Sequence, residues 1–297
     1  MTGPRPAGPK EQHVSVERVL WEACVRAHPY EQQLDATVAG GFDALSMPPH
    51  VALANAERGL SAPQMRAMAQ DRGVTLSHLD GGIGFMPAAL PSGATPRLVR
   101  RFGIPREQVL DLASDLGVHC LCTVGIFDQG LYRTDELIGG FQQLCDVAAE
   151  RGMDVTLEPM AFYGMQDFRL AAEVVREAGR PNGALLFDGW HFTRVGPDLA
   201  LLPELHTCGP IDVQVNDGAA EPLGASVMED STDHRMFPGE GAFDTTGYLR
   251  AIGPEHIRSF GVEIFSAELD RVPAVEAGRR AGQALRDVAQ SVGLALE

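Results

Sequence analysis

The sequence predicts an α/β fold, a closed (β/α)₈ barrel formed by a single domain. Short runs of β-branched and aliphatic residues alternate with longer helical patterns from end to end, which implies a parallel sheet. Eight such units fit into 297 residues, the length typical of the closed barrel. An open, doubly wound sheet is the alternative, but the first strand–helix turn lacks a G-x-G-x-x-G motif.

The first half of the chain contains four predicted strand–helix units. The strands are expected at residues 18–24, 42–47, 74–79 and 119–124. The helices are expected at residues 30–39, 61–71, 105–116 and 134–151. The glycine-rich segment 81–85, with Gly81, Gly82 and Gly84, is expected to be a loop after the third strand. It lacks the Lys-Ser/Thr pair of a phosphate-binding loop, so it predicts no more than an edge of the active site.

The second half is more regular and completes the eight strands. Its strands are expected at residues 154–158, 184–188, 211–216 and 259–264. Its helices are expected at residues 168–178, 199–205 and 273–292. No charge run, repeat or low-complexity linker indicates a second domain, so the barrel is expected to span residues 16–297. Residues 1–15, rich in proline and glycine at their start, are expected to form a disordered leader.

The net charge narrows the class of binding partner, and the cysteine content indicates the cellular compartment. A net charge of −16 argues against nucleic acid and against an anionic membrane surface, both of which attract clustered Lys and Arg. No run of 18 or more apolar residues predicts a transmembrane helix. Five irregularly spaced cysteines favour a reducing, cytoplasmic compartment. Cys120 and Cys122 are expected to pack in the core on opposite faces of one strand rather than to chelate a metal.

Polar side chains stand at or near the ends of the four late apolar runs. They are Glu158, Asp188, Gln214 and Glu263. Because a parallel barrel brings the carboxyl ends of its strands together at one mouth, these four side chains are expected to converge. Three carboxylates and an amide oxygen form a hard oxygen donor set that suits Mn²⁺, Mg²⁺ or Co²⁺. The sequence therefore predicts one divalent metal site, although any one of these residues alone would be read as an ordinary hydrogen-bonding group.

Two further residues are candidates for the same site. His191 follows Asp188 by three residues and is a candidate for contact with substrate oxygens or for acid/base work. Arg235, in the connection before the last strand, is a candidate for binding substrate hydroxyls or a carboxylate. A surface histidine and a solvent-exposed loop arginine are the alternatives. No G-x-S-x-G, Walker or H-E-x-x-H motif predicts a competing chemistry.

Four local motifs resemble one enzyme family. The L-E-P around Glu158, the D-x-x-H that ends at His191, the R-x-x-P-G-x-G that begins at Arg235 and the V-E-I-F around Glu263 are similar to the xylose-isomerase-like TIM-barrel superfamily. The resemblance covers the chain from about Val16 onward. It implies one divalent ion, commonly Mn²⁺ or Mg²⁺, a homo-oligomer, and proton exchange by two glutamates that map onto Glu158 and Glu263.

The third metal position departs from most of that family. Ketose 3-epimerases and inosose-type enzymes usually have histidine there, whereas this chain has Gln214. Glutamine at this place is similar to bacterial 3-dehydroshikimate dehydratases, although the strand-one motif of those enzymes is absent from residues 18–26. Gln214 is therefore the residue that bears most directly on the choice of reaction.

The leading hypothesis is a metal-dependent isomerase or epimerase of a small sugar or cyclitol. Such an enzyme acts on a small polyhydroxy carbonyl compound through metal-stabilised enolisation. The alternative is a metal-dependent dehydratase, a lyase of a cyclic keto-acid such as 3-dehydroshikimate or of a keto-cyclitol. An endonuclease-IV-like phosphodiesterase would need a cluster of histidines and a basic face, and a non-catalytic metal-binding subunit remains a fourth reading.

Overall fold

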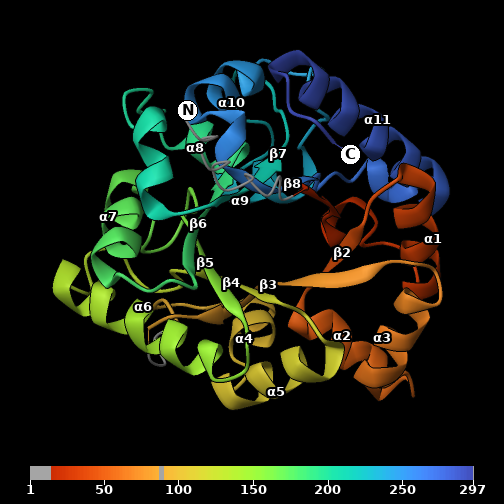
Figure 1. Cartoon of the computed structure of the whole chain (residues 1–297), viewed down its shortest axis with the longest axis horizontal. Coiled ribbons are helices and arrows are strands. Elements are labelled where there is room, and N and C mark those ends of the chain that lie inside the picture. Colours follow the sequence, from red (N-terminus) through yellow and green to blue (C-terminus); the bar gives the residue numbers. More distant parts are fainter. Residues whose placement is uncertain (1–14, 87–89, 297) are drawn as a thin grey trace, which may run out of the picture.

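Eight parallel strands close into a barrel in the order β1 to β8 in the computed structural model, which describes residues 15–86 and 90–296 (Figure 1). Each strand pairs with the next along the chain, and β1 pairs with β8 to close the ring. The predicted fold class is confirmed. The strands are β1 Glu17–Leu20, β2 Ala44–Met47, β3 Thr75–Gly84, β4 Cys120–Val124, β5 Asp154–Glu158, β6 Gly183–Asp188, β7 Ile211–Val215 and β8 Ile257–Val262.

Helices form the outer layer around this barrel (Figure 1). They are α1 Tyr30–Gly40, α2 Pro49–Glu57, α3 Ala62–Gln70, α4 Pro96–Phe102, α5 Arg106–Leu116, α6 Thr134–Ala149, α7 Phe168–Ala178, α8 Gly189–Arg194, α9 Val227–Asp233, α10 Thr245–Ile252 and α11 Ala274–Val292. Four short 3₁₀ helices are η1 Glu22–Cys24, η2 Leu202–Cys208, η3 Pro254–His256 and η4 Leu269–Arg271. Of the helices that the structure describes, none has the length and apolarity needed to cross a membrane.

Three local predictions are wrong. The first strand ends at Leu20, because the buried residues Glu22–Cys24 form a 3₁₀ turn. Most of segment 81–85 is not a loop, because β3 continues as far as Gly84 and Ile83 pairs with β4. A side chain at Gly82 would lie 2.0 Å from the ring of Pro49, so glycine lets α2 pack directly on this extension. The helix predicted at 199–205 is a 3₁₀ helix shifted to Leu202–Cys208. The short helices α2, α4, α8, α9 and α10 lie in connections that had no predicted helix.

Alternate residues of each strand fill the barrel and support its mouth. On β5, Val155 and Leu157 point outward into the main core, whereas Thr156 lies inside the barrel below Glu158. Cys120 and Cys122 both face the interior, where each sulfur lies within 3.7 Å of the Thr156 hydroxyl. The expectation that they lie on opposite faces is therefore wrong, because residues two apart on a strand share a face. Both cysteines are buried and free, as core packing requires.

A buried charge network lies inside the barrel below the predicted metal ligands. Asp212 accepts hydrogen bonds from Arg258, at 3.0 and 2.7 Å, and lies 3.3 Å from Nε2 of His78. Arg258 also donates to Asp154 at 2.6 Å. Two carboxylates face one guanidinium here, so protonation of His78 balances the network. Burial opposes protonation of the ring, but its neighbours Cys120 and Asp212 raise the pKa of His78 to about 10.

Because of this network, the stability of the barrel is expected to fall at alkaline pH. Because the pKa of His78 rises from 6.5 in the unfolded chain to about 10 in the folded protein, its contribution is complete below pH 6.5. The contribution is lost as the pH rises from 6.5 towards 10, by at most about 1.4 kcal/mol per pH unit. Urea unfolding of the wild type and of His78→Gln at pH 6.5, 8 and 9.5 measures it. The advantage of the wild type should shrink with pH, and a constant advantage would mean that His78 is neutral.

The first and last long helices pack through glycines. α1 and α11 lie side by side on the barrel (Figure 1). A Cβ at Gly278 would lie 2.1 Å from the carbonyl oxygen of Ala36, and a Cβ at Gly282 would lie 2.0 Å from that of Gly40. No side chain fits between these backbones, so the helices approach closely only because both positions are glycine.

Gly282→Ala is therefore expected to destabilise the protein by about 1–3 kcal/mol, because the added methyl group forces the two helices apart. Gly139→Ala is the matched control. Gly139 lies inside α6 with open space around its Cβ position, so alanine there should stabilise by up to about 1 kcal/mol. Urea unfolding of both variants measures the difference, and equal effects would contradict close packing of α1 on α11.

Candidate metal centre

The four predicted ligands meet at the carboxyl-terminal mouth of the barrel. Glu158 and Asp188 end β5 and β6, Gln214 lies one residue before the end of β7, and Glu263 follows β8 directly. Asp188 and Gln214 are register partners, and Gln214 donates from Nε2 to Glu263 at 3.1 Å. All four side chains are buried, although three of them carry a carboxyl group. Buried carboxyl groups in such a cluster need compensating positive charge.

Asp188 is held rigidly by the start of α8. Its Oδ1 caps that helix by accepting from the backbone N–H groups of Trp190, at 2.7 Å, and His191, at 3.0 Å. The same oxygen accepts from Asn216 at 3.1 Å. Its other oxygen, Oδ2, is free of these contacts and faces Arg235 at 2.7 Å. Burial alone would raise the pKa of Asp188, but Arg235 and the N–H of His191 hold it below the usual aspartate value.

Gln214 presents a carbonyl oxygen that has no partner among the described residues. Its Oε1 is buried without a hydrogen bond, whereas its Nε2 is fixed on Glu263. An unsatisfied buried acceptor is unfavourable by about 1–3 kcal/mol, so this oxygen requires a water molecule or an ion as its partner. A bound cation would satisfy this oxygen, and an amide oxygen is an ordinary ligand for hard divalent ions.

Arg235 links two of the carboxylates. Its Nη1 donates to Asp188 at 2.7 Å and to Glu263 at 2.8 Å, and its Nε donates to the backbone oxygen of Ser231 at 3.1 Å. The guanidinium lies between the rings of Trp190 and Phe265, each 5.1 Å from its central carbon. Arg235 is therefore a buried, fixed cation at the centre of the site.

His191 enters the site as a neutral ring. Its Nδ1 accepts from the backbone N–H of Ala161 at 3.1 Å, so the ring proton is on Nε2. Nε2 lies 3.6 Å from Oε1 of Glu158. Burial lowers the pKa of His191 to about 3, with Asp188 and Arg235 acting in opposite directions on it. The sequence made His191 a candidate for acid/base work or for contact with substrate oxygens, and in the structure it is a neutral N–H donor.

The charges of the site suit one divalent cation. Burial raises the pKa of Glu158 and of Glu263 well above the usual range, and neighbouring carboxylates raise both further, against the influence of Arg235. Counted as ionised, Glu158, Asp188 and Glu263 carry three negative charges, and Arg235 supplies one positive charge. Two negative charges remain, which one Mn²⁺, Mg²⁺ or Co²⁺ ion would balance. The donor set and the unpartnered oxygen of Gln214 thus fit such an ion.

Two acidic residues of the mouth were not identified from the sequence. Asp80, on β3, is buried, and its Oδ2 has no partner among the described residues. Glu22, on η1, accepts from Gln33 at 3.2 Å, and burial together with the charge of Asp80 raises the pKa of Glu22 to about 7. Asp80 directly follows a predicted strand, so the rule that found Glu158 could have found it. Glu22 lies in a segment that was predicted to be strand and gave no signal.

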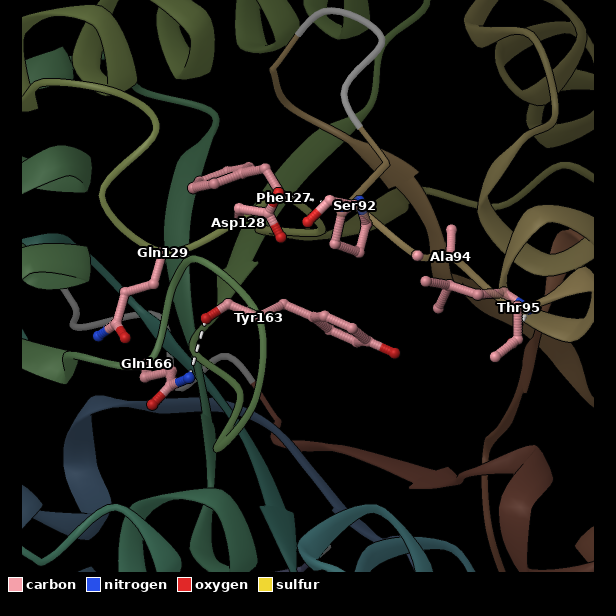
Figure 2. A pocket seen from close by; sticks show the side chains of 11 residues that line it. Ser92, Ala94, Thr95, Phe127, Asp128, Gln129, Tyr163 and Gln166 are labelled. Carbon is pink, nitrogen blue, oxygen red and sulfur yellow. Dashed lines mark hydrogen bonds between the residues drawn. The ribbon is translucent and has the colours of Figure 1, made fainter.

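A pocket of about 450 Å³ lies at the same end of the barrel (Figure 2). It is lined by the connections that follow β3, β4 and β5, which also border the mouth. Tyr163 crosses it, and its ring points towards Ala94 and Thr95 (Figure 2). Phe162 packs edge-on against both Tyr163 and His191, at 5.2 and 5.3 Å between ring centres. Phe162 thus connects Tyr163, which lines the pocket, to His191.

Comparison with known proteins places this geometry among related barrels. A family profile described as xylose isomerase-like TIM barrel matches residues 34–288. An inosose isomerase of Bacillus velezensis is 30% identical over 142 residues, which are 45% of this chain and 48% of that protein. A 3-dehydroshikimate dehydratase of Pseudomonas putida is 25% identical over 238 residues, which are 79% of this chain and 36% of that protein. The chain thus spans about half of the first relative and about a third of the second.

Solved structures share the same fold at low identity. The IOLI protein, crystallised with a zinc atom, superposes with a TM-score of 0.74 at 20% identity, covering 94% of this chain and 98% of that one. A probable 3-DHS dehydratase, AsbF of Bacillus anthracis, superposes with a TM-score of 0.63 at 14% identity, covering 88% and 97%. At these identities the likeness extends to the barrel architecture alone.

Proposed function

Because the chain belongs to the xylose isomerase-like TIM-barrel family, we propose that it is a divalent-metal-dependent isomerase or epimerase that enolises a small sugar or cyclitol. The observation that carries the proposal is the set of buried oxygen donors at the mouth, with the unpartnered Oε1 of Gln214 among them. Glu158, Asp188, Gln214 and Glu263 would hold the ion, which is Mn²⁺, Mg²⁺ or Co²⁺. When bound, such an ion acts as a Lewis acid towards a carbonyl oxygen.

The side chains around this site supply the proton chemistry in our proposal. Glu158 and Glu263 lie on elements separated by β6 and β7, so a substrate between them presents different faces to the two carboxyl groups. One carboxylate removes the proton next to the carbonyl, and the other returns it. The N–H of His191, directed at Glu158, orients a substrate oxygen. Arg235 fixes Asp188 and Glu263 in place, and its role in substrate binding remains a prediction.

A dehydratase is the second candidate, and Gln214 favours it. Glutamine at this position is similar to bacterial 3-dehydroshikimate dehydratases, and the Pseudomonas putida relative matches 79% of this chain. Such an enzyme removes the same type of proton and then expels a β-hydroxyl group as water. The leaving oxygen needs a proton donor, and the carboxyl group that has taken the substrate proton would return it there, so that the hydroxyl leaves as water. The neutral His191 would only donate a hydrogen bond from Nε2–H to that oxygen.

Proton exchange in D₂O separates the two candidates. Purified protein with Mn²⁺ is incubated with an inosose and, separately, with 3-dehydroshikimate, and NMR follows deuterium at the carbon next to the carbonyl. Deuterium uptake with a new stereoisomer supports the isomerase, and ultraviolet absorbance of an aromatic product supports the dehydratase. Both signals should disappear with EDTA. Metal-loaded protein that exchanges no proton in either substrate would contradict an enolising enzyme for these compound classes.

A further inference from the structure

A second arginine, Arg101, lies beside the mouth and forms no ion pair with any residue that the structure describes. Arg101, near the end of α4, lies against β3: a Cβ at Gly81 would lie 3.0 Å from its Nη2. Its Nε is buried and has no acceptor among the described residues, and its central carbon lies 5.3 Å from the ring centre of Phe102. Gly81 has a φ of +57°, a conformation that suits glycine, and its missing side chain leaves the guanidinium next to the strand.

Arg101 lies against Gly81, the residue after Asp80 of the mouth, but it forms no ion pair in the part of the chain that the structure describes. Its positive charge opposes the burial that raises the pKa of Glu22, Asp80 and Glu158, so it lies within electrostatic reach of all three. Asp80 also has an unpartnered oxygen, Oδ2. Arg235 shows the contrast, because its guanidinium binds two carboxylates directly. The donors of Arg101 thus remain available to a ligand in the mouth.

The wall beside Arg101 is apolar and ends in a hydroxyl group. Phe102 and Phe162 pack with Tyr163 around a small buried cluster formed by Val124, Ile126 and Met160. Tyr163 has a φ of 69°, the only positive value among the described non-glycine residues, so its backbone is held in a strained conformation. Burial raises the pKa of Tyr163 and the charges of Arg101 and Arg97 oppose this, so the phenol lies near both arginines. This wall suits the face of a ring or short carbon chain.

Helix α4 is positively charged, although the protein as a whole is negatively charged. The chain carries a net charge of −16, which repels anions from most of its surface. α4 carries Arg97, Arg100 and Arg101, and His50 of α2 lies close to all three. Burial and these arginines lower the pKa of His50 to about 4, so the ring is neutral and adds no charge. The cationic helix is thus a local attraction for an anion beside the mouth.

We propose that Arg101, assisted by the hydroxyl of Tyr163, binds a carboxylate of the substrate, which makes the substrate a hydroxy-keto acid rather than a neutral sugar. A planar guanidinium with free N–H groups matches a carboxylate in a two-point hydrogen bond. The carbonyl end of this assignment rests on the proposed enolising metal centre, which both candidate functions share, whereas the carboxylate end replaces the sugar or cyclitol of the first candidate with a keto acid. The carboxylate end rests on Arg101 and its surroundings alone, and it favours the keto-acid class among the candidate substrates.

Binding of two unreactive probes tests the assignment. Shikimate is a cyclic polyol with a carboxylate and no ketone, and myo-inositol is a neutral cyclic polyol. Isothermal titration calorimetry with the Mn²⁺-loaded protein compares the wild type, Arg101→Gln, Arg101→Lys and Arg100→Gln. Arg100 is an exposed neighbour on α4, so Arg100→Gln removes the same charge outside the mouth.

We expect shikimate to bind the wild type and to bind Arg101→Gln at least about tenfold more weakly, because a charged hydrogen bond is lost. Arg101→Lys should retain part of the affinity, and Arg100→Gln should stay near the wild type. Affinity for myo-inositol should be the same in the wild type and Arg101→Gln. Equal weakening of both probes, an unchanged shikimate affinity in Arg101→Gln, or no shikimate binding to the wild type would overturn the assignment.

A separate measurement tests whether Arg101 supports binding of the metal rather than binding of the carboxylate. Mn²⁺ uptake by Arg101→Gln, measured by elemental analysis, should equal that of the wild type. Loss of Mn²⁺ uptake in that variant would overturn the assignment, because Arg101 would then support the metal centre instead. A wild type that binds shikimate through Arg101 but takes up no divalent ion would refute the proposed metal function while leaving the carboxylate site intact.

Discussion

Replacing Glu158 with alanine should remove the divalent ion from the purified protein and lower turnover by about 10²–10⁴-fold. The variant removes one carboxylate ligand and, in our proposal, one of the two groups that move the substrate proton. Mn²⁺ should raise the midpoint of thermal unfolding of the wild type by several degrees, because it binds only the folded protein. The same addition should leave the midpoint of Glu158→Ala nearly unchanged.

Glu107→Ala is the matched control for this experiment. Glu107 is an exposed glutamate on α5, and its carboxylate pairs with Arg151 at 3.0 Å. Its loss should alter neither metal content nor turnover. Elemental analysis and thermal unfolding of the three proteins give the readout. Stoichiometric Mn²⁺ in Glu158→Ala, or none in the wild type after incubation with excess ion, would end the metal hypothesis.

Arg235→Met should destabilise the metal-free protein by about 3–5 kcal/mol, because it leaves Asp188 and Glu263 as buried carboxylates without a cation. Part of the loss should be recovered when Mn²⁺ is added, since the ion supplies the positive charge that the variant lacks. The increase in stability on adding Mn²⁺ should therefore be larger in Arg235→Met than in the wild type. Urea unfolding in EDTA and in excess Mn²⁺ measures both values.

Two further variants keep this prediction testable. Arg235→Lys preserves the charge but cannot bind two carboxylates in the same geometry, so its stability should lie between those of the wild type and Arg235→Met. Arg72→Met removes an arginine whose partners, Glu31 and Asp35, are exposed, so it should lose about 1 kcal/mol or less. If Mn²⁺ stabilised Arg235→Met no more than the wild type, Arg235 and the ion would not share the same carboxylates.

Much of the barrel could be predicted because its signals are local. The alternation within β5 and β7 identifies strands, and the ends of those strands place Glu158 and Gln214 at one mouth. The errors lie where tertiary contacts override local preference. The glycines of β3 suggest a loop, but pairing with β4 and the contact of Pro49 with Gly82 keep the segment extended. Residues Glu22–Cys24 continue an apolar strand pattern, yet they turn into a 3₁₀ helix.

The substrate-binding side of the site could be predicted less well from the sequence. Asp188 and Arg235 could be identified as candidates, but their direct ion pair depends on how the connection after β7 folds over the mouth. Arg101 carries no motif, and only the packing of α4 on β3 brings it beside Gly81. The protonation of His191 likewise depends on the N–H of Ala161, which follows β5. Contacts of this kind join residues that are distant in sequence, so no local pattern encodes them.

The pairing of β1 with β8 has a consequence for synthesis on the ribosome. β1 emerges first of the eight strands, but its second partner appears about 240 residues later, so one side of β1 stays unpaired until β8 has been made. Glu263 follows β8 directly, and the α1–α11 contact forms later still. A nascent chain that has emerged only as far as β7 therefore contains Glu158, Asp188 and Gln214 but not yet Glu263, the fourth predicted ligand. Such late closure exposes strand edges and favours assistance by chaperones.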